Sequence, residues 1–277
     1  MNTYLESPIT SRQNPRIQAL ANLRERRERD SQKKYLIEGL RELSRALSCG
    51  MNILEVYFCP ALFKNTPDAQ LMLQLVKQGG ISLCEIGKSA FEKASGREGM
   101  DGLLGVAAMR DRHGLDELQL PPMSALILVV EAVEKPGNLG ALFRVADSAG
   151  CSALICCDAV VDIYNPSVIR ASQGALFSMQ CAVATTQETI RFLLSKKIKV
   201  FATTPDSTKQ YWDVDYKQSA AIILGSEKEG LSKLWLTEHH GFERISIPQE
   251  GSSDSLNVGI AGAICLYEAL RQRRLGN

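Results

Sequence analysis

The chain reads I-S-I-P-Q-E-G-S-S-D-S-L-N-V-G at Ile245–Gly259, and this stretch joins the end of a strand to the start of a helix. Its first three residues alternate apolar and polar, and Pro248–Asp254 is rich in residues that favour loops. The small and apolar residues of Val258–Leu270 follow with helical spacing. Backbone N–H groups at a helix N-terminus can bind a ligand. The stretch alone leaves two interpretations open: a ligand site, or a simple helix cap at Asp254 or Ser255.

Chain length and composition indicate an ordinary globular protein. The 277 residues suffice for one large domain or two modest ones, and 45% are hydrophobic. No apolar run approaches the roughly 20 residues of a membrane span, and Met1–Ser11 has no apolar signal core, so we expect a cytoplasmic protein with no membrane partner. The eight cysteines form no C-x-x-C pair, which predicts reduced thiols and no metal site.

Positive charge is concentrated near the N-terminus. Residues 10–34 contain eight basic and three acidic side chains, although the whole chain carries a net charge of only +1. Such a segment is a candidate nucleic-acid contact. The alternative is a solvated helix face with ion pairs such as Glu25–Arg29, and the charge by itself favours this alternative.

The pattern of apolar runs predicts two α/β domains. We expect a basic N-terminal segment (1–30), a small α/β domain (31–112), a linker that ends in two prolines (113–123) and a second α/β domain (124–277). In the first half we expect helices at 12–29, 39–48, 68–77 and 89–94, and strands at 53–59, 81–86 and 103–109. In the second we expect strands at 125–133, 153–157, 199–203, 220–224 and 242–247, and helices at 141–149, 167–176, 187–195, 231–237 and 258–271. Within the first of these strands the run 125–130 is continuously apolar, which is typical of a parallel sheet covered on both faces.

Three loops of the second domain contain glycine and follow expected strands. They are 136–140, 225–230 and 248–254. Ligands bind beyond the carboxyl ends of the strands in open parallel sheets, so these loops can converge on one site. The polar residues that they and their helices bring are Asn138, Arg144, Glu227, Ser255 and Asn257.

Several enzyme classes are disfavoured by the same loops. They hold neither a histidine nor a cysteine, which argues against Ser-His-Asp hydrolysis. The chain has no G-x-x-x-x-G-K-[ST] motif and no G-x-G-x-x-G motif after a strand. P-loop enzymes, Rossmann dehydrogenases and Rossmann-type methyltransferases are therefore not indicated.

The three loops together resemble the motifs of a known family. P-G-N-L-G-A-L-F-R-V-A-D-S-A-G (136–150), I-I-L-G-S-E-K-E-G-L-S (222–232) and I-S-I-P-Q-E-G-S-S-D-S-L-N-V (245–258) resemble, in order, the three motifs of the SpoU (TrmH-like) RNA methyltransferases of the SPOUT superfamily. The likeness covers nearly the whole second domain. In the first half, I-T-S-R-Q-N-P-R-I (9–17) and I-E-G-L-R-E (37–42) are similar to the family's small RNA substrate-binding domain.

This resemblance implies a function and a fold. The function is transfer of a methyl group from S-adenosylmethionine to a ribose 2′-hydroxyl of RNA, with ribosomal RNA favoured by the N-terminal half. The fold is a parallel-sheet SPOUT domain with a deep trefoil knot, in a homodimer whose active site lies near the subunit interface. Three alternatives stay open: a tRNA 2′-O-methyltransferase, a non-catalytic RNA-binding or ribosome assembly factor, and an α/β enzyme for a small nucleotide.

The resemblance also implies roles for individual residues. The catalytic set is Arg144, Asn138, Glu227, Ser255 and Asn257, and the cofactor-binding set is Thr203, Gly225, Ile247 and Leu256. With an RNA substrate, the basic segment becomes a candidate RNA contact through Arg12, Arg16, Arg24, Arg26 and Arg27. The motifs depart from the usual pattern at Glu134, Asp254 and Gly259, and the first two departures keep the charge.

The family's usual proposal makes the arginine, here Arg144, the base that deprotonates the ribose hydroxyl. A guanidinium holds its proton firmly in proteins. We therefore expect Arg144 to position the RNA phosphate and polarise the hydroxyl, while the proton leaves through a neighbouring group or water. Glu227, Ser255 and Asn257 would orient that network.

Overall fold

The computed structural model describes residues 7–96, 99–110, 113–237, 241–251 and 255–275. The chain divides into two compact units: unit 1 contains residues 1–111 and 163–177, and unit 2 contains residues 112–162 and 178–277. The segment 163–177, which the sequence placed in the second domain, therefore folds with the first unit.

Unit 2 is built around a parallel sheet. Its elements, in chain order, are η2 (Leu115–Glu117), β5 (Leu126–Glu131), α6 (Pro136–Ser148), β6 (Ala153–Cys157), β7 (Cys181–Ala184), α9 (Thr186–Ser195), β8 (Lys199–Thr203), β9 (Ala220–Leu224), α10 (Lys233–Leu236), β10 (Glu243–Ile245) and α11 (Val258–Leu275). Within the described residues the sheet has six strands in the order β10-β8-β9-β5-β6-β7, and every pairing is parallel. The parallel α/β fold expected from the apolar runs is confirmed.

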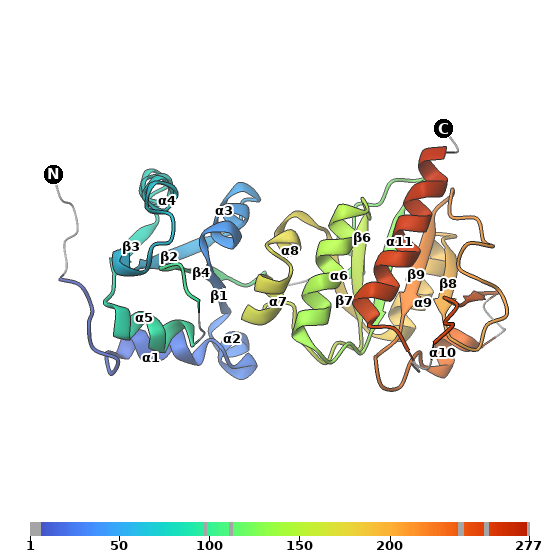
Figure 1. Ribbon diagram of the computed structural model, residues 1–277, viewed down its shortest axis with the longest axis horizontal. Helices are drawn as coiled ribbons and strands as arrows, with labels where there is room; N and C mark the ends of the chain where they lie inside the picture. Colours follow the sequence, from blue (N-terminus) through green and yellow to red (C-terminus); the bar gives the residue numbers. More distant parts are fainter. Residues whose placement is uncertain (1–6, 97–98, 111–112, 238–240, 252–254, 276–277) are drawn as a thin grey trace. The chain divides into compact units, whose positions relative to one another are not determined.

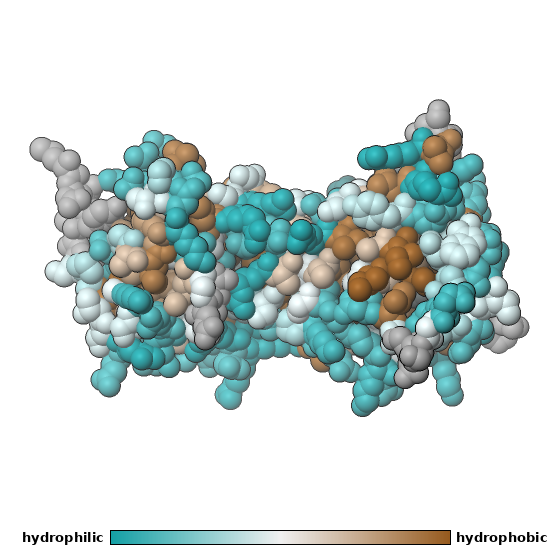
Figure 2. Space-filling view, in the orientation of Figure 1, coloured by the Kyte–Doolittle hydropathy of each residue, from teal (hydrophilic) through white to brown (hydrophobic). Residues whose placement is uncertain are grey.

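Both faces of this sheet are covered. On one face, Ile190 and Leu193 of α9 and Trp235 of α10 pack against the strands. On the other face, α6 and α11 lie side by side (Figure 1), and a Cβ at Gly262 of α11 would meet Leu142 of α6 at 2.8 Å. All residues of β5 and β9 are buried as a result. Apolar residues also gather on the outer surface over α6 and α11 (Figure 2).

Unit 1 is a smaller mixed α/β structure. Its elements are α1 (Pro15–Asn22), α2 (Arg26–Gln32), β1 (Lys34–Glu38), α3 (Leu40–Ser48), β2 (Ile53–Phe58), η1 (Pro60–Leu62), α4 (Thr66–Gln78), β3 (Ser82–Glu85), α5 (Lys88–Ser95), β4 (Leu103–Ala108) and α7 (Pro166–Ala171), followed by α8 (Ala175–Ser178) at its boundary. Among the described residues, its sheet has the order β1-β4-β2-β3, and only the β2–β3 pairing is parallel. α1 and α5 pack on one face, and the chain from β1 leads into α3 on the other (Figure 1).

The basic segment differs from the single helix that the sequence predicts. It forms two helices, α1 and α2, and Arg29 is buried where it donates from Nη1 to the carbonyl oxygens of Leu23 at 2.8 Å and Arg24 at 2.6 Å. Ile17 and Leu20 of α1 belong to the core of unit 1. The basic segment is thus an integral part of this unit rather than an appendage.

Three further local expectations are wrong. The expected loop 134–140 is mostly the first turn of α6, because Pro136 stands at the start of the helix, where its missing N–H costs nothing. The expected helix 167–176 is broken by left-handed backbone at Gln173 and Gly174. The strand β7 was not expected, since it is only four residues long.

The expected linker is also packed. η2 lies within it, and Leu115, Leu118 and Leu120 pack against the core of unit 2.

Candidate active site

Three polar side chains from the three loops are joined by hydrogen bonds. Asn138, in the first turn of α6, donates from Nδ2 to Oε1 of Glu227 in the loop after β9. Asn257, which precedes α11, donates from Nδ2 to Oδ1 of Asn138 over 3.1 Å. The structure therefore brings together three of the five residues expected to be catalytic.

Asn257 is also the cap of α11. Its Oδ1 accepts from the N–H of Gly259 at 2.9 Å and from the N–H of Ile260 at 3.4 Å. The carbonyl end of this amide is thus occupied by the helix, which leaves the NH₂ end to face Asn138. The cap that the sequence suggested at Asp254 or Ser255 lies instead at Asn257, and Asp254 is outside the described residues.

The loop that carries Glu227 closes tightly on itself. The N–H of Ser226 donates to the carbonyl of Gly230 and the N–H of Gly230 donates to the carbonyl of Ser226, both at 3.1 Å. A Cβ at Gly225 would lie 2.2 Å from the carbonyl carbon of Gly230 and 2.5 Å from the backbone nitrogen of Leu231. Only glycine fits at position 225, because the atoms that a Cβ would strike are backbone.

A buried carboxylate anchors the far end of this loop. Glu131, the last residue of β5, is 4% exposed and accepts four hydrogen bonds. The donors are the Ser232 N–H at 2.7 Å, the Ser232 hydroxyl at 2.8 Å, the Thr186 hydroxyl at 2.7 Å and the Trp235 indole N–H at 3.1 Å. Glu131 thereby ties the loop after β9 to the end of β5. The sequence did not single out this residue.

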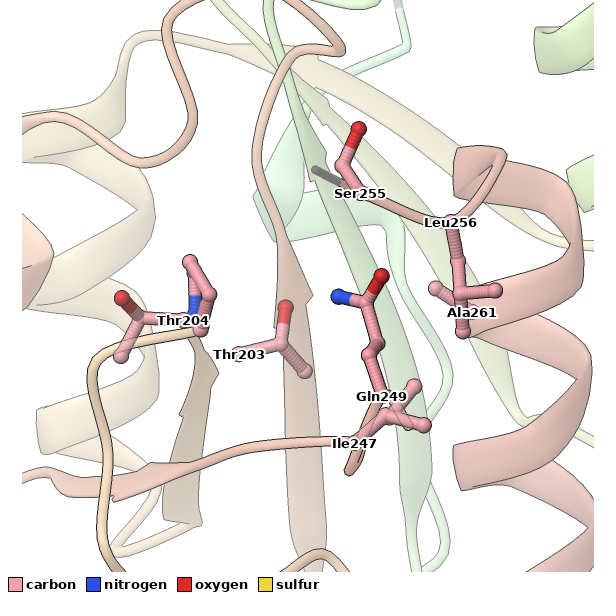
Figure 3. Close-up of a pocket in the computed structure, with 8 residues that line it drawn as sticks. Thr203, Thr204, Ile247, Gln249, Ser255, Leu256 and Ala261 are labelled. Carbon is pink, nitrogen blue, oxygen red and sulfur yellow. The ribbon is translucent and has the colours of Figure 1, made fainter. Parts of the chain in front are cut away.

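A pocket opens beside these loops, at the carboxyl ends of β8 and β10. Three expected cofactor residues line it, Thr203, Ile247 and Leu256, together with Ser255. Figure 3 shows the Gln249 amide between Thr203 on one side and Leu256 on the other. Thr203 is held by its hydroxyl, which donates to the carbonyl of Ile223 at 2.7 Å.

Four lining residues were missed by the sequence: Thr204, Pro205, Gln249 and Ala261. Gln249 stands inside the stretch Ile245–Gly259, so its polar side chain between a strand and a helix was a usable signal. The other three lack a signal of their own, because they are small or turn residues that reach the pocket through the path of the backbone.

Arg144 stands apart from the other expected catalytic residues. It lies on α6 with an exposed side chain, and its guanidinium has no hydrogen bond or ion pair within the described residues. An exposed guanidinium on a helix that also carries Asn138 is available to an anion such as a phosphate.

The arginines expected to contact RNA fall into two groups in unit 1. Arg12, Arg26 and Arg27 are exposed, and Arg26 forms an ion pair with Asp30 at 3.7 Å. The other two take part in the packing of unit 1. Arg16 donates to the Tyr57 hydroxyl at 3.2 Å, and Arg24 donates to the Ala21 carbonyl at 3.1 Å and fills the space above Gly96.

The cysteines near the sheet of unit 2 are not nucleophiles. Burial raises the pKa of the Cys157 thiol and of the Cys265 thiol to about 12. Both therefore stay protonated at neutral pH. All eight cysteines are free thiols. Among the described residues, His, Cys, Asp and Glu side chains form no group of three or more that could hold a metal ion.

Both units match known protein families. Residues 125–267 match the SpoU rRNA Methylase family. Residues 14–105 match the MRM3-like substrate binding domain. These two ranges correspond to most of unit 2 and most of unit 1.

Individual relatives agree with the family matches. The chain is 35% identical over 192 residues to a 23S rRNA (guanosine-2′-O-)-methyltransferase RlmB of Ralstonia nicotianae, covering 66% of this chain and 75% of the relative. A crystal structure of an RNA 2′-O ribose methyltransferase is 39% identical, with a TM-score of 0.85 over 97% of this chain and all of that one. An AdoMet-bound rRNA methyltransferase from Sinorhizobium meliloti is 27% identical, with a TM-score of 0.84 over 96% of this chain and 97% of that one.

Proposed function

The chain belongs to the SpoU rRNA methylase family, and on this premise we propose that it transfers a methyl group from S-adenosylmethionine to a ribose 2′-hydroxyl of ribosomal RNA. The observation that carries this function is the hydrogen-bonded group of Asn138, Glu227 and Asn257. It adjoins Leu256, which lines the pocket. Relatives named for rRNA methylation also support a cytoplasmic location.

The pocket residues fit the proposed cofactor. The pocket has a cavity volume of about 110 Å³. Ile247, Leu256 and Ala261 offer apolar surface, while Thr203 and Gln249 offer polar atoms. The backbone of Gly225 would complete the site. S-adenosylmethionine, when bound, supplies a methyl group activated by a positively charged sulfur.

The protein's own residues would align the RNA and manage the proton. A ribose hydroxyl is a weak nucleophile, so it must be held in place and lose its proton as it reacts. Arg144 would bind the adjacent phosphate and polarise the hydroxyl. Asn138, itself held by Asn257, donates to one carboxylate oxygen of Glu227, which leaves the second oxygen to receive a hydrogen bond from the hydroxyl or a water. Ser255 would contact the RNA from the rim of the pocket.

Replacing Arg144 with alanine should lower kcat by roughly 100-fold to 1,000-fold, the usual effect of losing one positioned charge in an active site. The affinity for S-adenosylmethionine, measured by calorimetry, should stay the same, because Arg144 does not line the pocket. Arg144→Lys is the matched control, and it should recover only part of the rate, since an ammonium cannot form the same two-pronged contact. Near-full activity of Arg144→Lys with normal RNA affinity would rule out an essential guanidinium.

One experiment separates the proposed function from its alternatives. Calorimetry with S-adenosylmethionine is followed by incubation with 23S ribosomal RNA or tRNA transcripts and mass spectrometry of the digested nucleosides. We expect cofactor binding and a 2′-O-methylated nucleoside from the ribosomal transcript. A product from the tRNA transcript alone would change the substrate. Absence of both cofactor binding and product would favour a non-catalytic RNA-binding factor.

We also propose that the protein acts as a homodimer through the face formed by α6 and α11. Ile260 and Tyr267 are seven residues apart on α11 and are 54% and 51% exposed. Figure 2 shows apolar residues gathered over these two helices. Such areas on a soluble unit favour association. Arg144, exposed on α6, would then lie near the partner.

Ile260→Glu combined with Tyr267→Glu should convert the dimer to a monomer in light-scattering chromatography and reduce methyl transfer with it. The charges would be buried without partners at an interface. Leu194→Glu is the control, since Leu194 is 43% exposed on α9, which covers the opposite face of the sheet. If the double variant kept the mass of the native protein, this face would not be the interface.

The trefoil knot expected from the family resemblance remains a prediction. Chain segments after β8, after β10 and at the start of α11 meet at the pocket. No described helix is long and apolar enough to span a membrane.

A further inference from the structure

Unit 1 has a polar hollow of its own, away from the basic N-terminal segment. It lies where α3, the chain after η1, the loop at 99–101 and α7 meet, and its lining includes Arg41, Lys64, Asp101 and Arg170. α7 belongs to the segment inserted between β6 and β7 along the chain. The hollow is therefore built from two distant parts of the sequence that fold together within unit 1.

The charges of this hollow are sorted by depth. The carboxylates lie at its base: the Glu42 side chain is 6% exposed and the Glu38 side chain, beneath Arg170, is 3% exposed. The cations lie at its surface, with the Arg41 side chain 55% exposed and the Arg170 side chain 26% exposed. An approaching ligand therefore meets positive charge first.

The buried acids fix the orientation of the arginines. Arg41 donates from Nε and Nη2 to the same oxygen of Glu42, at 3.2 and 2.7 Å. Arg170 donates to Glu38 and, at 2.9 Å, to the Ser167 hydroxyl. Lys64 donates to the Gly99 carbonyl at 2.8 Å. Each cation uses only some of its N–H donors in these bonds. Nη1 of Arg41 has no partner within the described residues.

The third acid does not compete for these donors. Asp101 accepts from the backbone N–H of Leu40 at 2.8 Å and from that of Leu103 at 3.4 Å. Asp101 thus stabilises the turn at Gly39, where φ is +112°. Preorganised guanidinium groups with spare N–H donors suit an oxyanion such as phosphate.

We propose that this hollow binds a backbone phosphate of the substrate RNA through Arg41, Lys64 and Arg170. The inference rests on the proposed function for its choice of RNA as the source of the phosphate. It adds a second RNA contact, distinct from Arg12, Arg26 and Arg27, and one that includes a residue of the inserted segment. The site would hold the RNA in register while the ribose reacts in unit 2.

The test is the salt dependence of RNA binding by the full chain. The variant Arg41→Gln with Lys64→Gln removes two exposed cations and leaves the Glu38–Arg170 pair intact. With a 23S ribosomal RNA transcript as the probe, affinity should fall about tenfold or more at 0.1 M salt. The slope of log K against log salt should become shallower by roughly 0.7–0.9, because one phosphate contact fewer releases its counterions.

Two controls keep this test sharp. Lys77→Gln removes an exposed lysine in the last turn of α4, at the end of that helix away from Lys64, and it should leave both affinity and slope unchanged. Lys64→Gln alone, at an exposed side chain, should give about half of the change in slope if the double variant proves unstable. Native affinity and slope in a folded double or single variant would overturn the phosphate site. Calorimetry with S-adenosylmethionine should be unaffected in all variants, so failure of the native protein to bind it would instead count against the proposed function.

Discussion

Replacing Gly225 with alanine should weaken binding of S-adenosylmethionine by roughly 100-fold. The new Cβ would lie 2.2 and 2.4 Å from the carbonyl carbon and oxygen of Gly230. These are backbone atoms of the same closed loop, so no side chain can rotate away, and the loop itself must move. Forcing such a contact costs about 2–3 kcal/mol, which corresponds to roughly 30-fold to 150-fold in an equilibrium constant. Calorimetric titration of the cofactor measures the effect.

Gly137→Ala is the matched control for this change. A Cβ at Gly137 meets nothing within 4 Å, and the residue lies in the first turn of α6, where alanine is favoured over glycine. This variant should bind the cofactor as the native protein does and unfold at the same or a slightly higher temperature. Equal affinities in the Gly225 and Gly137 variants would show that the loop after β9 does not shape the pocket.

Replacing Glu131 with glutamine should release the loop that carries Glu227. The two carboxylate oxygens of Glu131 accept from four donors, three at Oε1 and the Ser232 N–H at Oε2. A glutamine can satisfy the first three only by turning its NH₂ toward the Ser232 N–H, which sets donor against donor. In a buried site this costs about 2–4 kcal/mol, or a fall in Tm of roughly 5–10 °C. Amide hydrogen exchange at residues 226–232 should speed up together with that fall.

Thr186→Val separates this anchoring from a general loss of stability. It removes one donor to Oε1 of Glu131 with little change of shape and leaves both hydrogen bonds of Ser232 in place. We expect a loss of about 1 kcal/mol and native protection of the loop. If Glu131→Gln left amide hydrogen exchange at residues 226–232 unchanged, the Glu131 carboxylate would stabilise the core without positioning Glu227.

The sequence predicted the parallel sheet and most of the site because both are encoded in short stretches. Continuous apolar runs such as 126–130 and 220–224 are typical of strands covered on two faces, and the structure buries them fully. Three motifs in order, each with a loop after a strand, brought Asn138, Glu227 and Asn257 within hydrogen-bonding distance as expected. The lining of the pocket by Ile247 and Leu256 follows from the third motif, whereas Thr203 lies outside the motifs, at the end of β8.

Features that depend on distant residues escaped the sequence. Arg29 points inward and donates to the carbonyl of Leu23 because the chain breaks between α1 and α2. The spacing of residues in the sequence does not reveal where that break falls. The segment 163–177 folds with unit 1 because Tyr164 stacks on Tyr35, with ring centroids 4.4 Å apart, and Arg170 pairs with Glu38. None of these partners is near in sequence.

The sequence by itself therefore determined the fold class, the family and the order of the three motif loops. The tertiary structure decided which acid anchors the site, which amide caps α11 and which arginines are exposed. Glu131 shows the reason most clearly: its partners Thr186, Ser232 and Trp235 lie 55, 101 and 104 positions away along the chain. A hydrogen bond acts over about 3 Å, so its partners are known only once the path of the backbone has brought them together.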